Sequence, residues 1–226
     1  MSAPILCYVT DRLSLRAVPP ATRLDALLHK IQAAAGAGID WIQIREKDLP
    51  DSDCAALTRA ALDAAATSAT PSHHAKILIN GRPGLALAAN AHGAHLAEDS
   101  LAKLATKKVW NAVNHSLDRP DGLFLIGVSS HSLESASEAE SHGADYIIFG
   151  PVFETPSKAR FGAPQGLDRL AEVCNAVSIP VLAIGGISLA NAASCLAAGA
   201  AGIAAIRLFQ DAPDLPGLVQ ALHTLP

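Results

Sequence analysis

The segment "ESHGADYIIFG" (140–150) places the end of a helix, a glycine and a short apolar strand in direct succession. The same order recurs in "AAAGAGIDWIQIR" (33–45) and in "LAAGAAGIAAIR" (196–207). Glycine commonly caps the C-terminus of a helix, and a short apolar run after it favours a buried strand. Three copies of one helix-to-strand joint indicate repeated βα units, and therefore a parallel sheet.

The rest of the chain extends this alternation. Strands are predicted at 5–10, 40–45, 75–80, 93–96, 123–129, 145–150, 180–186 and 202–207. Patterns with helical spacing lie between them, as at 24–38 and 133–144, and the polar stretch 101–122 is expected to hold a helix and an exposed loop. Eight such units predict one (β/α)8 TIM barrel over 1–226, with a doubly wound open sheet as the alternative.

The composition excludes several classes of protein. Half of the residues are hydrophobic, 17% are charged and the net charge is −4, which does not suit a nucleic-acid or acidic-membrane surface. No apolar run reaches the length of a membrane-spanning helix, and the N-terminus lacks the basic start of a signal peptide. The four cysteines have no C-x-x-C spacing and are predicted to be buried free thiols in a reducing, cytoplasmic compartment: Cys7, Cys54, Cys174 and Cys195.

Polar residues gather at the predicted carboxyl ends of the strands, where TIM barrels carry their functional sites. The opposite ends are mostly apolar or small. In "QIREK" the residues Gln43, Arg45 and Lys47 alternate, which would place them on one side of an extended segment. Two cations and an amide there suit a phosphate or a diphosphate. Surface charge beyond the strand end is the alternative interpretation.

A second set of residues follows the later strands. Gly185 and Gly186 end the seventh strand, and Ile206 and Arg207 end the eighth, where barrels often bind phosphate. Glycines let main-chain N–H groups approach a phosphate closely, although a tight turn alone would also explain them. The polar loop 153–164 is a candidate lid, and its candidate ligand-binding residues are Thr155, Ser157 and Lys158.

Histidines near strand ends are candidates for proton transfer near neutral pH. His131 follows "IGVSS" and His95 follows Gly93 and Ala94 near the end of the fourth predicted strand, although a single histidine is more often structural. Asn80 and Ser129 also end strands and are candidate ligand-binding residues. The remaining histidine pairs match no set of metal ligands, so no metal site is predicted from spacing.

The motifs taken together resemble a known family. "YVTDR", "QIREK", "LIN", "GAHL", "IGVSSHSLESA", "GADYIIFGPVFETPSK", "PVLAIGGI" and "AGAAGIAAI" are similar, in order and spacing over about 5–210, to the thiamine phosphate synthase/TenI family. The resemblance implies a (β/α)8 barrel that handles a thiazole phosphate in vitamin B1 synthesis. In that family the position of Arg207 usually holds a small residue, so its guanidinium would either bind the phosphate or narrow the pocket.

The family has two branches with different chemistry. The synthase joins hydroxymethylpyrimidine diphosphate to thiazole phosphate with Mg²⁺, and the resemblance implies one Asp after Asn80 and a second in an "HLGQ-x-D" segment. Gly81 and Ser100 stand at those places here. Mg²⁺ prefers carboxylate oxygens, so this loss argues against the synthase unless Asp99 or Glu98 replaces them.

The TenI-like branch is a thiazole tautomerase, which aromatises carboxythiazole phosphate, and the resemblance implies proton transfer by His131. This reading needs no cofactor and is the leading hypothesis. A synthase with Mg²⁺ is the alternative, favoured by Arg45 and Lys47, and a non-catalytic thiazole phosphate-binding protein is the second. The expected partner is this small molecule, with no nucleic acid and no membrane. Whether the protein forms a homo-oligomer stays open.

Overall fold

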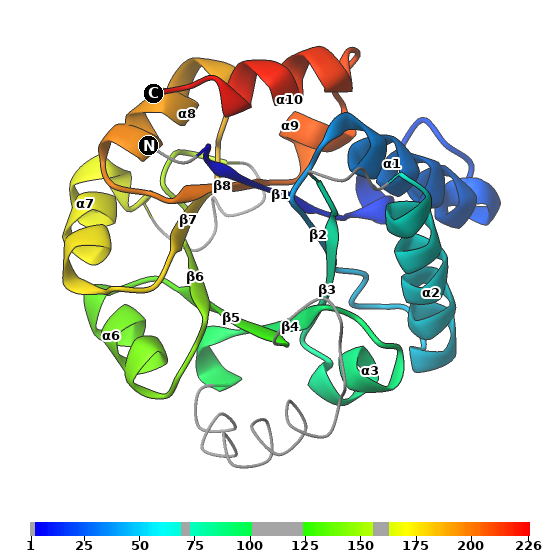
Figure 1. Cartoon of the computed structure of the whole chain (residues 1–226), viewed down its shortest axis with the longest axis horizontal. Helices are drawn as coiled ribbons and strands as arrows, with labels where there is room; N and C mark the ends of the chain where they lie inside the picture. Colours follow the sequence, from blue (N-terminus) through cyan, green and yellow to red (C-terminus); the bar gives the residue numbers. More distant parts are fainter. Residues whose placement is uncertain (1–2, 69–72, 101–123, 156–162) are drawn as a thin grey trace.

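The sheet is a closed barrel of eight parallel strands in the order β1 to β8, as Figure 1 shows. The computed structural model describes residues 3–68, 73–100, 124–155 and 163–226. The strands are β1 (Ile5–Val9), β2 (Trp41–Ile44), β3 (Lys76–Asn80), β4 (Gly93–Leu96), β5 (Leu125–Ser130), β6 (Tyr146–Phe149), β7 (Val181–Ile184) and β8 (Gly202–Ala205). All eight predicted strands and the TIM barrel are confirmed. The open sheet is wrong, because β1 pairs with β8 and closes the barrel.

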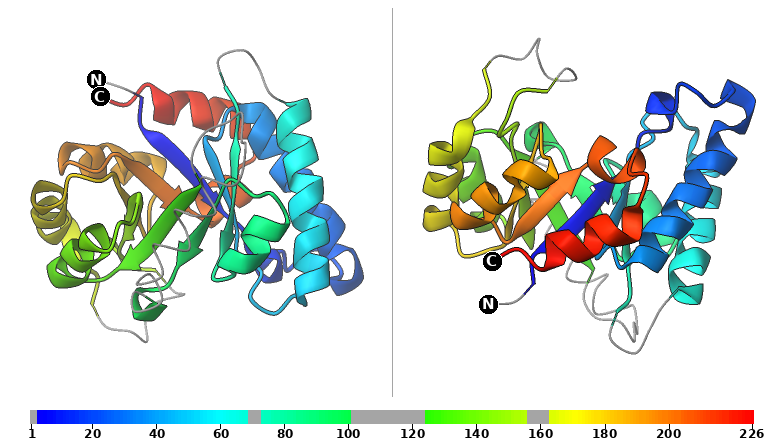
Figure 2. Two further views of the ribbon diagram at one scale, coloured as in Figure 1. Left: turned by 60° about the horizontal axis from the view of Figure 1, so that its bottom comes forward. Right: turned by 90° about the horizontal axis from the view of Figure 1, so that it is seen from above.

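The helices form a ring around the barrel (Figure 1). They are α1 (Arg23–Ala37), α2 (Asp51–Thr67), α3 (Pro83–Ala88), α6 (Leu133–Ser141), α7 (Gly166–Ala176), α8 (Leu189–Ala197), α9 (Arg207–Gln210) and α10 (Leu215–His223). Short 3₁₀ turns are η1 (Arg12–Ser14), η2 (Pro20–Thr22) and η3 (Glu98–Ser100). The helix and loop predicted for 101–122 lie outside the described residues. The later helix α10 packs beside β1, which joins the two ends of the fold (Figure 2).

The three predicted helix-to-strand joints share one backbone device. Gly38, Gly143 and Gly199 have φ values of 93°, 87° and 98°, which side chains disfavour and glycine adopts freely. Each glycine turns the chain from a helix into the strand that follows within a few residues. The repeated motif therefore reflects a repeated turn at the amino ends of β2, β6 and β8.

Side chains fill the interior of the barrel. The inner cluster consists of Cys7, Val9, Trp41, Leu78, Tyr146, Ile148, Leu182 and Ala204. The Trp41 and Tyr146 rings lie 4.7 Å apart between centroids. The Tyr146 ring passes directly over Gly127, where an added Cβ would lie 1.9 Å from Cζ. Trp41 and Tyr146, at the amino ends of β2 and β6, fill that end of the barrel, so a ligand must bind nearer the carboxyl ends of the strands.

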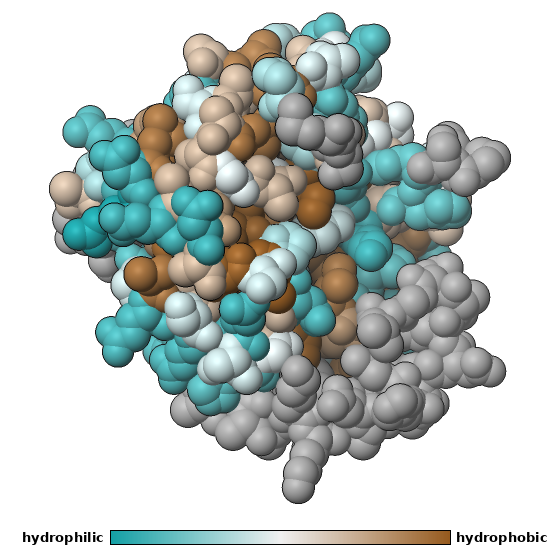
Figure 3. Space-filling model, turned by 60° about the vertical axis from the view of Figure 1, so that its left-hand side comes forward, coloured by the Kyte–Doolittle hydropathy of each residue, from teal (hydrophilic) through white to brown (hydrophobic). Residues whose placement is uncertain are grey.

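The outer surface mixes apolar and polar side chains. On the face that carries the left-hand helices of Figure 1, hydrophobic side chains lie among hydrophilic ones (Figure 3). Within the described ranges, Leu13, Leu133 and Leu189 are the large hydrophobic residues that stand exposed. No described helix is both long enough and apolar enough to cross a bilayer.

The cysteines are free, as predicted. Cys7, Cys54 and Cys195 are buried, and Cys174 is half-buried. Burial raises the pKa of Cys174 to about 11. The pKa of Cys195 is also raised to about 11, first by burial and second by the nearby Cys174. These thiols are protonated at neutral pH and therefore poor nucleophiles.

Candidate active site

A continuous arc of polar side chains lines one half of the barrel mouth. Gln43, Asn80, His95 and Ser129 belong to the neighbouring strands β2, β3, β4 and β5. Gln43 Nε2 donates to Asn80 Oδ1 at 3.0 Å, and Asn80 is in register with His95. His95 Nε2 lies 2.9 Å from Ser129 Oγ. The structure thus brings these four residues together, and hydrogen bonds join them in pairs.

The opposite half of the mouth is apolar. Val9 on β1 and Ile148 on β6 belong to the inner cluster, and Ile184 on β7 and Ile206 after β8 pack against it. The mouth therefore has a polar wall on β2–β5 and an apolar wall on the other four strands. Two walls of this kind suit a small ring that carries polar groups on one side.

His95 is a structural histidine in this arrangement. Its side chain is buried, and Nδ1 lies 3.2 Å from the Tyr146 hydroxyl. Burial first, and the positive charge of Arg45 second, lower the pKa of His95 to about 3. The ring is therefore neutral at physiological pH, and its two nitrogens connect Tyr146 with Ser129.

His131 has a different environment, better suited to proton transfer. It follows β5, is half-buried, and its Nδ1 contacts the main-chain carbonyl of Gly150. A carbonyl oxygen only accepts hydrogen bonds, so Nδ1 of a neutral ring must carry the proton. This leaves the lone pair on Nε2, which can take a proton from a ligand.

Three serines hold the turn that carries His131. Ser130 Oγ donates to Ser132 O at 2.9 Å and lies 2.6 Å from Ser135 Oγ. Ser132 caps α6, because its side chain accepts from the Ser135 amide while its own amide donates to Ser135 Oγ. The residues on both sides of His131 are therefore held, and the contact of its Nδ1 with Gly150 O orients the ring.

The segment after β2 departs from the predicted alternation. The strand ends at Ile44, and Lys47 lies exposed in the following turn. Arg45 continues the strand direction, with its amide donating to Thr10 Oγ1 at 3.0 Å. The prediction that Gln43, Arg45 and Lys47 share one extended side is wrong beyond Arg45, because the chain must turn to begin α2.

Sequence reasoning missed three residues of this region. Glu46 is a buried carboxylate, and Arg12 and Arg82 contact the loop that contains it. The sequence does place both arginines shortly after strand ends, which marks them as residues of the barrel mouth. Their targets are main-chain carbonyls and carboxylates from other loops, which no local pattern indicates.

The glycines predicted to bind phosphate also have a packing role. Gly185 and Gly186 have φ values of 98° and 65°. An added Cβ on Gly185 would lie 2.5 Å from Pro151 Cβ, and one on Gly186 would lie 2.5 Å from Glu154 O. The loop after β6 thus requires both glycines, and their phosphate role stays a prediction.

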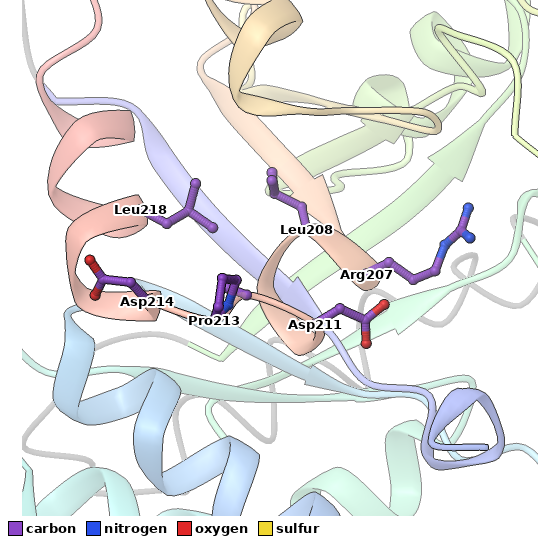
Figure 4. A pocket seen from close by; sticks show the side chains of 7 residues that line it. Arg207, Leu208, Asp211, Pro213, Asp214 and Leu218 are labelled. Carbon is purple, nitrogen blue, oxygen red and sulfur yellow. The ribbon is translucent and has the colours of Figure 1, made fainter. Parts of the chain in front are cut away.

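Arg207 starts α9 and is exposed. It lines a shallow pocket of about 300 Å³ together with Leu208, Asp211, Ala212, Pro213, Asp214 and Leu218, which Figure 4 shows. No other predicted site residue in the described ranges lines this pocket. The phosphate roles of Ile206 and Arg207 stay predictions. Thr155 is half-buried, and Ser157 and Lys158 lie outside the described residues.

The described residues do not provide the donor set of a two-carboxylate magnesium site. Gly81 has a φ of 72°, and its amide donates to His95 O at 2.7 Å. Glu98, Asp99 and Ser100 form η3, where Ser100 Oγ donates to Asp99 at 3.4 Å. In the part of the chain that the structure describes, no three His, Cys, Asp or Glu side chains gather as a metal site would need.

Comparisons with known proteins agree on one family. The family described as "Thiamine monophosphate synthase" matches residues 15–209. A "Putative thiamine-phosphate synthase" of Geobacter sulfurreducens is 40% identical over 88% of this chain and 86% of its own length. A "Thiamine-phosphate synthase" of Roseiflexus sp. is 37% identical over 98% and 84%. The structure of a thiamine phosphate pyrophosphorylase from Pyrococcus furiosus superposes with a TM-score of 0.76 at 29% identity, over 98% of this chain and 95% of that one.

Proposed function

The chain belongs to the thiamine monophosphate synthase family, and from this premise we propose that it acts on a thiazole phosphate in thiamine biosynthesis, as a thiazole tautomerase. The observation that carries the proposal is the His131 ring, whose contact with Gly150 leaves Nε2 as a base at the barrel mouth. Gly81, which brings no carboxylate to the end of β3, supports chemistry that does not depend on a magnesium ion.

The proposed reaction moves one proton within the substrate. His131 Nε2 takes a proton from the non-aromatic ring, the double bonds shift, and the imidazolium returns a proton to another carbon of the same molecule. Atoms and charge balance, and no second substrate is needed. Positioned general acid–base catalysis of this kind contributes rate factors of roughly 10²–10⁴.

The two walls of the mouth give the substrate an orientation. We place its carboxylate near Arg45 and the polar arc, and its ring against Ile148 and Ile184. The phosphate would lie toward Gly185, Gly186, Ile206 and Arg207, and the loop residues Thr155, Ser157 and Lys158 would close over the ring. Ser129, held by His95, would direct its hydroxyl toward the carboxylate.

A second candidate is thiamine phosphate synthase, and the names of the relatives favour it over the tautomerase. One feature of the site also favours it. Gln43 Oε1 is buried and has no hydrogen-bond partner among the described residues. A carboxythiazole phosphate offers mostly acceptors, whereas an amino-substituted pyrimidine would bring a donor to this oxygen. This candidate needs Mg²⁺ held through Asp99 or Glu98.

Two assays on one preparation separate the candidates. The first follows aromatisation of the carboxythiazole phosphate with the unaltered protein and with His131→Ala. The second follows thiamine phosphate formation from the pyrimidine diphosphate and thiazole phosphate, with Mg²⁺ or with a chelator.

Acceleration in the first assay that His131→Ala abolishes supports the tautomerase. No acceleration by either protein refutes it, and Mg²⁺-dependent product in the second assay assigns the synthase. Thiazole phosphate binding with neither activity identifies a binding protein. The predicted cytoplasmic location and a homo-oligomer stay predictions.

A further inference from the structure

Arg82 directs its guanidinium at the loop between β2 and α2. Its Nη2 donates to the main-chain carbonyls of Leu49 at 2.7 Å and Lys47 at 3.1 Å, with that of Glu46 at 3.4 Å. Nη1 lies 3.2 Å from the Asp51 carboxylate at the start of α2. One side chain from the β3 loop thus contacts the β2 loop along its length.

The same loop is held from the other side by the segment after β1. Glu46 is only 5% exposed, and its carboxylate accepts from Thr10 Oγ1 at 2.7 Å and Arg12 Nη1 at 3.1 Å. A buried carboxylate is stable only with such partners. Arg12 also forms a bidentate pair with Asp48, with both N–O distances at 2.7 Å.

These contacts hold the loop that begins at Arg45. Arg45 precedes Glu46, and its amide donates to Thr10 Oγ1 at 3.0 Å. Arg45 is half-buried and lies two residues beyond Gln43, whose side chain belongs to the polar arc. Arg45 is therefore carried next to the polar arc by a loop that the side chains of Arg82, Arg12 and Thr10 hold in place.

We propose that Arg82 is a positioning residue for anion binding, which acts through the β2–α2 loop on Arg45. The inference rests on the proposed function, because it requires an anionic ligand at the mouth. A loop that is ordered before binding loses less conformational entropy when the ligand arrives, so affinity rises without a contact between Arg82 and the ligand.

The test is calorimetric binding of inorganic diphosphate to the full chain, with inorganic phosphate as a second probe. Arg82→Lys keeps the charge, but one ammonium cannot reproduce the forked contacts with Leu49, Lys47 and Asp51. We expect its affinity for diphosphate to fall by about three- to tenfold, since ordering costs of this size accompany one or two flexible groups. Arg59→Lys, an exposed arginine on α2, is the matched control and should bind as the unaltered protein does.

Two further measurements identify a positioning role. Main-chain amides of residues 47–49 and 51 should exchange hydrogen faster in Arg82→Lys than in Arg59→Lys. In an Arg45→Ala background, Arg82→Lys should weaken binding little further, because the two residues act on one route. If Arg82→Lys folds poorly, Asp51→Asn is a milder second variant. It removes only the ion pair with Arg82 and should lower the affinity for diphosphate by a smaller factor.

The outcomes separate this inference from the proposed function. Diphosphate affinity equal in Arg82→Lys and the unaltered protein overturns the inference alone. Fully additive losses in the Arg45→Ala, Arg82→Lys pair also overturn it, because Arg82 would then act without Arg45. If the unaltered protein binds neither diphosphate nor phosphate, the ligand class of the proposed function and the inference fall together.

Discussion

His95 Nε2 lies 2.9 Å from Ser129 Oγ, and this contact joins β4 to β5 in the centre of the polar arc. Because the pKa of His95 is lowered to about 3, the ring in the folded protein stays neutral across the pH range in which an unfolded histidine becomes protonated. The burial of His95 therefore makes the stability of the barrel depend on pH.

The first prediction concerns this dependence. Below the ordinary pKa of 6.5, the unfolded state binds a proton at His95 that the folded state refuses, so stability falls as the pH drops toward about 3. One such group contributes up to about 1.4 kcal/mol per pH unit in that range. Urea unfolding between pH 7.5 and 4.5 should show this slope, and His95→Gln should flatten it while lowering stability at pH 7.5 by about 1–3 kcal/mol. An equal slope in both proteins would contradict the role of His95.

The second prediction concerns the turn at His131. Ser130→Ala removes the hydroxyl that binds Ser132 O and approaches Ser135 Oγ, so the turn loosens. We expect kcat for aromatisation to fall by about tenfold with little change in KM, and stability to fall by about 1 kcal/mol. Ser141→Ala, at the exposed end of α6, is the control and should change neither value. An unchanged kcat in Ser130→Ala would show that the ring of His131 needs no such support.

The third prediction concerns the filling of the barrel. In Gly127→Ala the new Cβ would lie 1.9 Å from Tyr146 Cζ, so the ring must leave the position in which it packs against Trp41 and His95. We expect a loss of about 3 kcal/mol or more in the free energy of unfolding. Gly84→Ala lies in α3 with no atom within 4 Å of its Cβ, and should be neutral or stabilising by up to about 1 kcal/mol. Thermal unfolding of both variants decides, and similar melting temperatures would argue against a tightly packed Tyr146.

The fourth prediction restores the missing carboxylates. Gly81→Asp with Ser100→Asp should create Mg²⁺-dependent diphosphate binding and make the variant more stable in Mg²⁺ than in a chelator, because paired carboxylates repel without an ion. Position 81 has room for a Cβ, but its φ of 72° strains any side chain by about 1 kcal/mol.

Gly81→Asn with Ser100→Asn separates the two effects, since it brings the same backbone strain without new charge. Calorimetric titration of diphosphate with and without Mg²⁺ measures both variants. Strong Mg²⁺-dependent binding by the unaltered protein would contradict the loss of the metal site and favour the synthase.

The sequence by itself determined the architecture. The glycine joints at Gly38, Gly143 and Gly199 and the eight short apolar runs are local features, and the alternation of these runs with helical patterns predicts all eight strands. The polar residues at strand ends were equally predictable, because the carboxyl ends of parallel strands must meet at one face. For that reason Gln43, Asn80 and Ser129 lie where the sequence placed them.

Only the tertiary structure decided which of those groups meet. The proton position on His131 depends on a carbonyl of Gly150 from the next strand, and the neutrality of His95 depends on burial within the closed barrel. Arg82 contacts the β2 loop, and Arg207 lines a pocket beside α10. These relations join residues that are distant in the chain, and they are set by the register and closure of the sheet, which local periodicity does not encode.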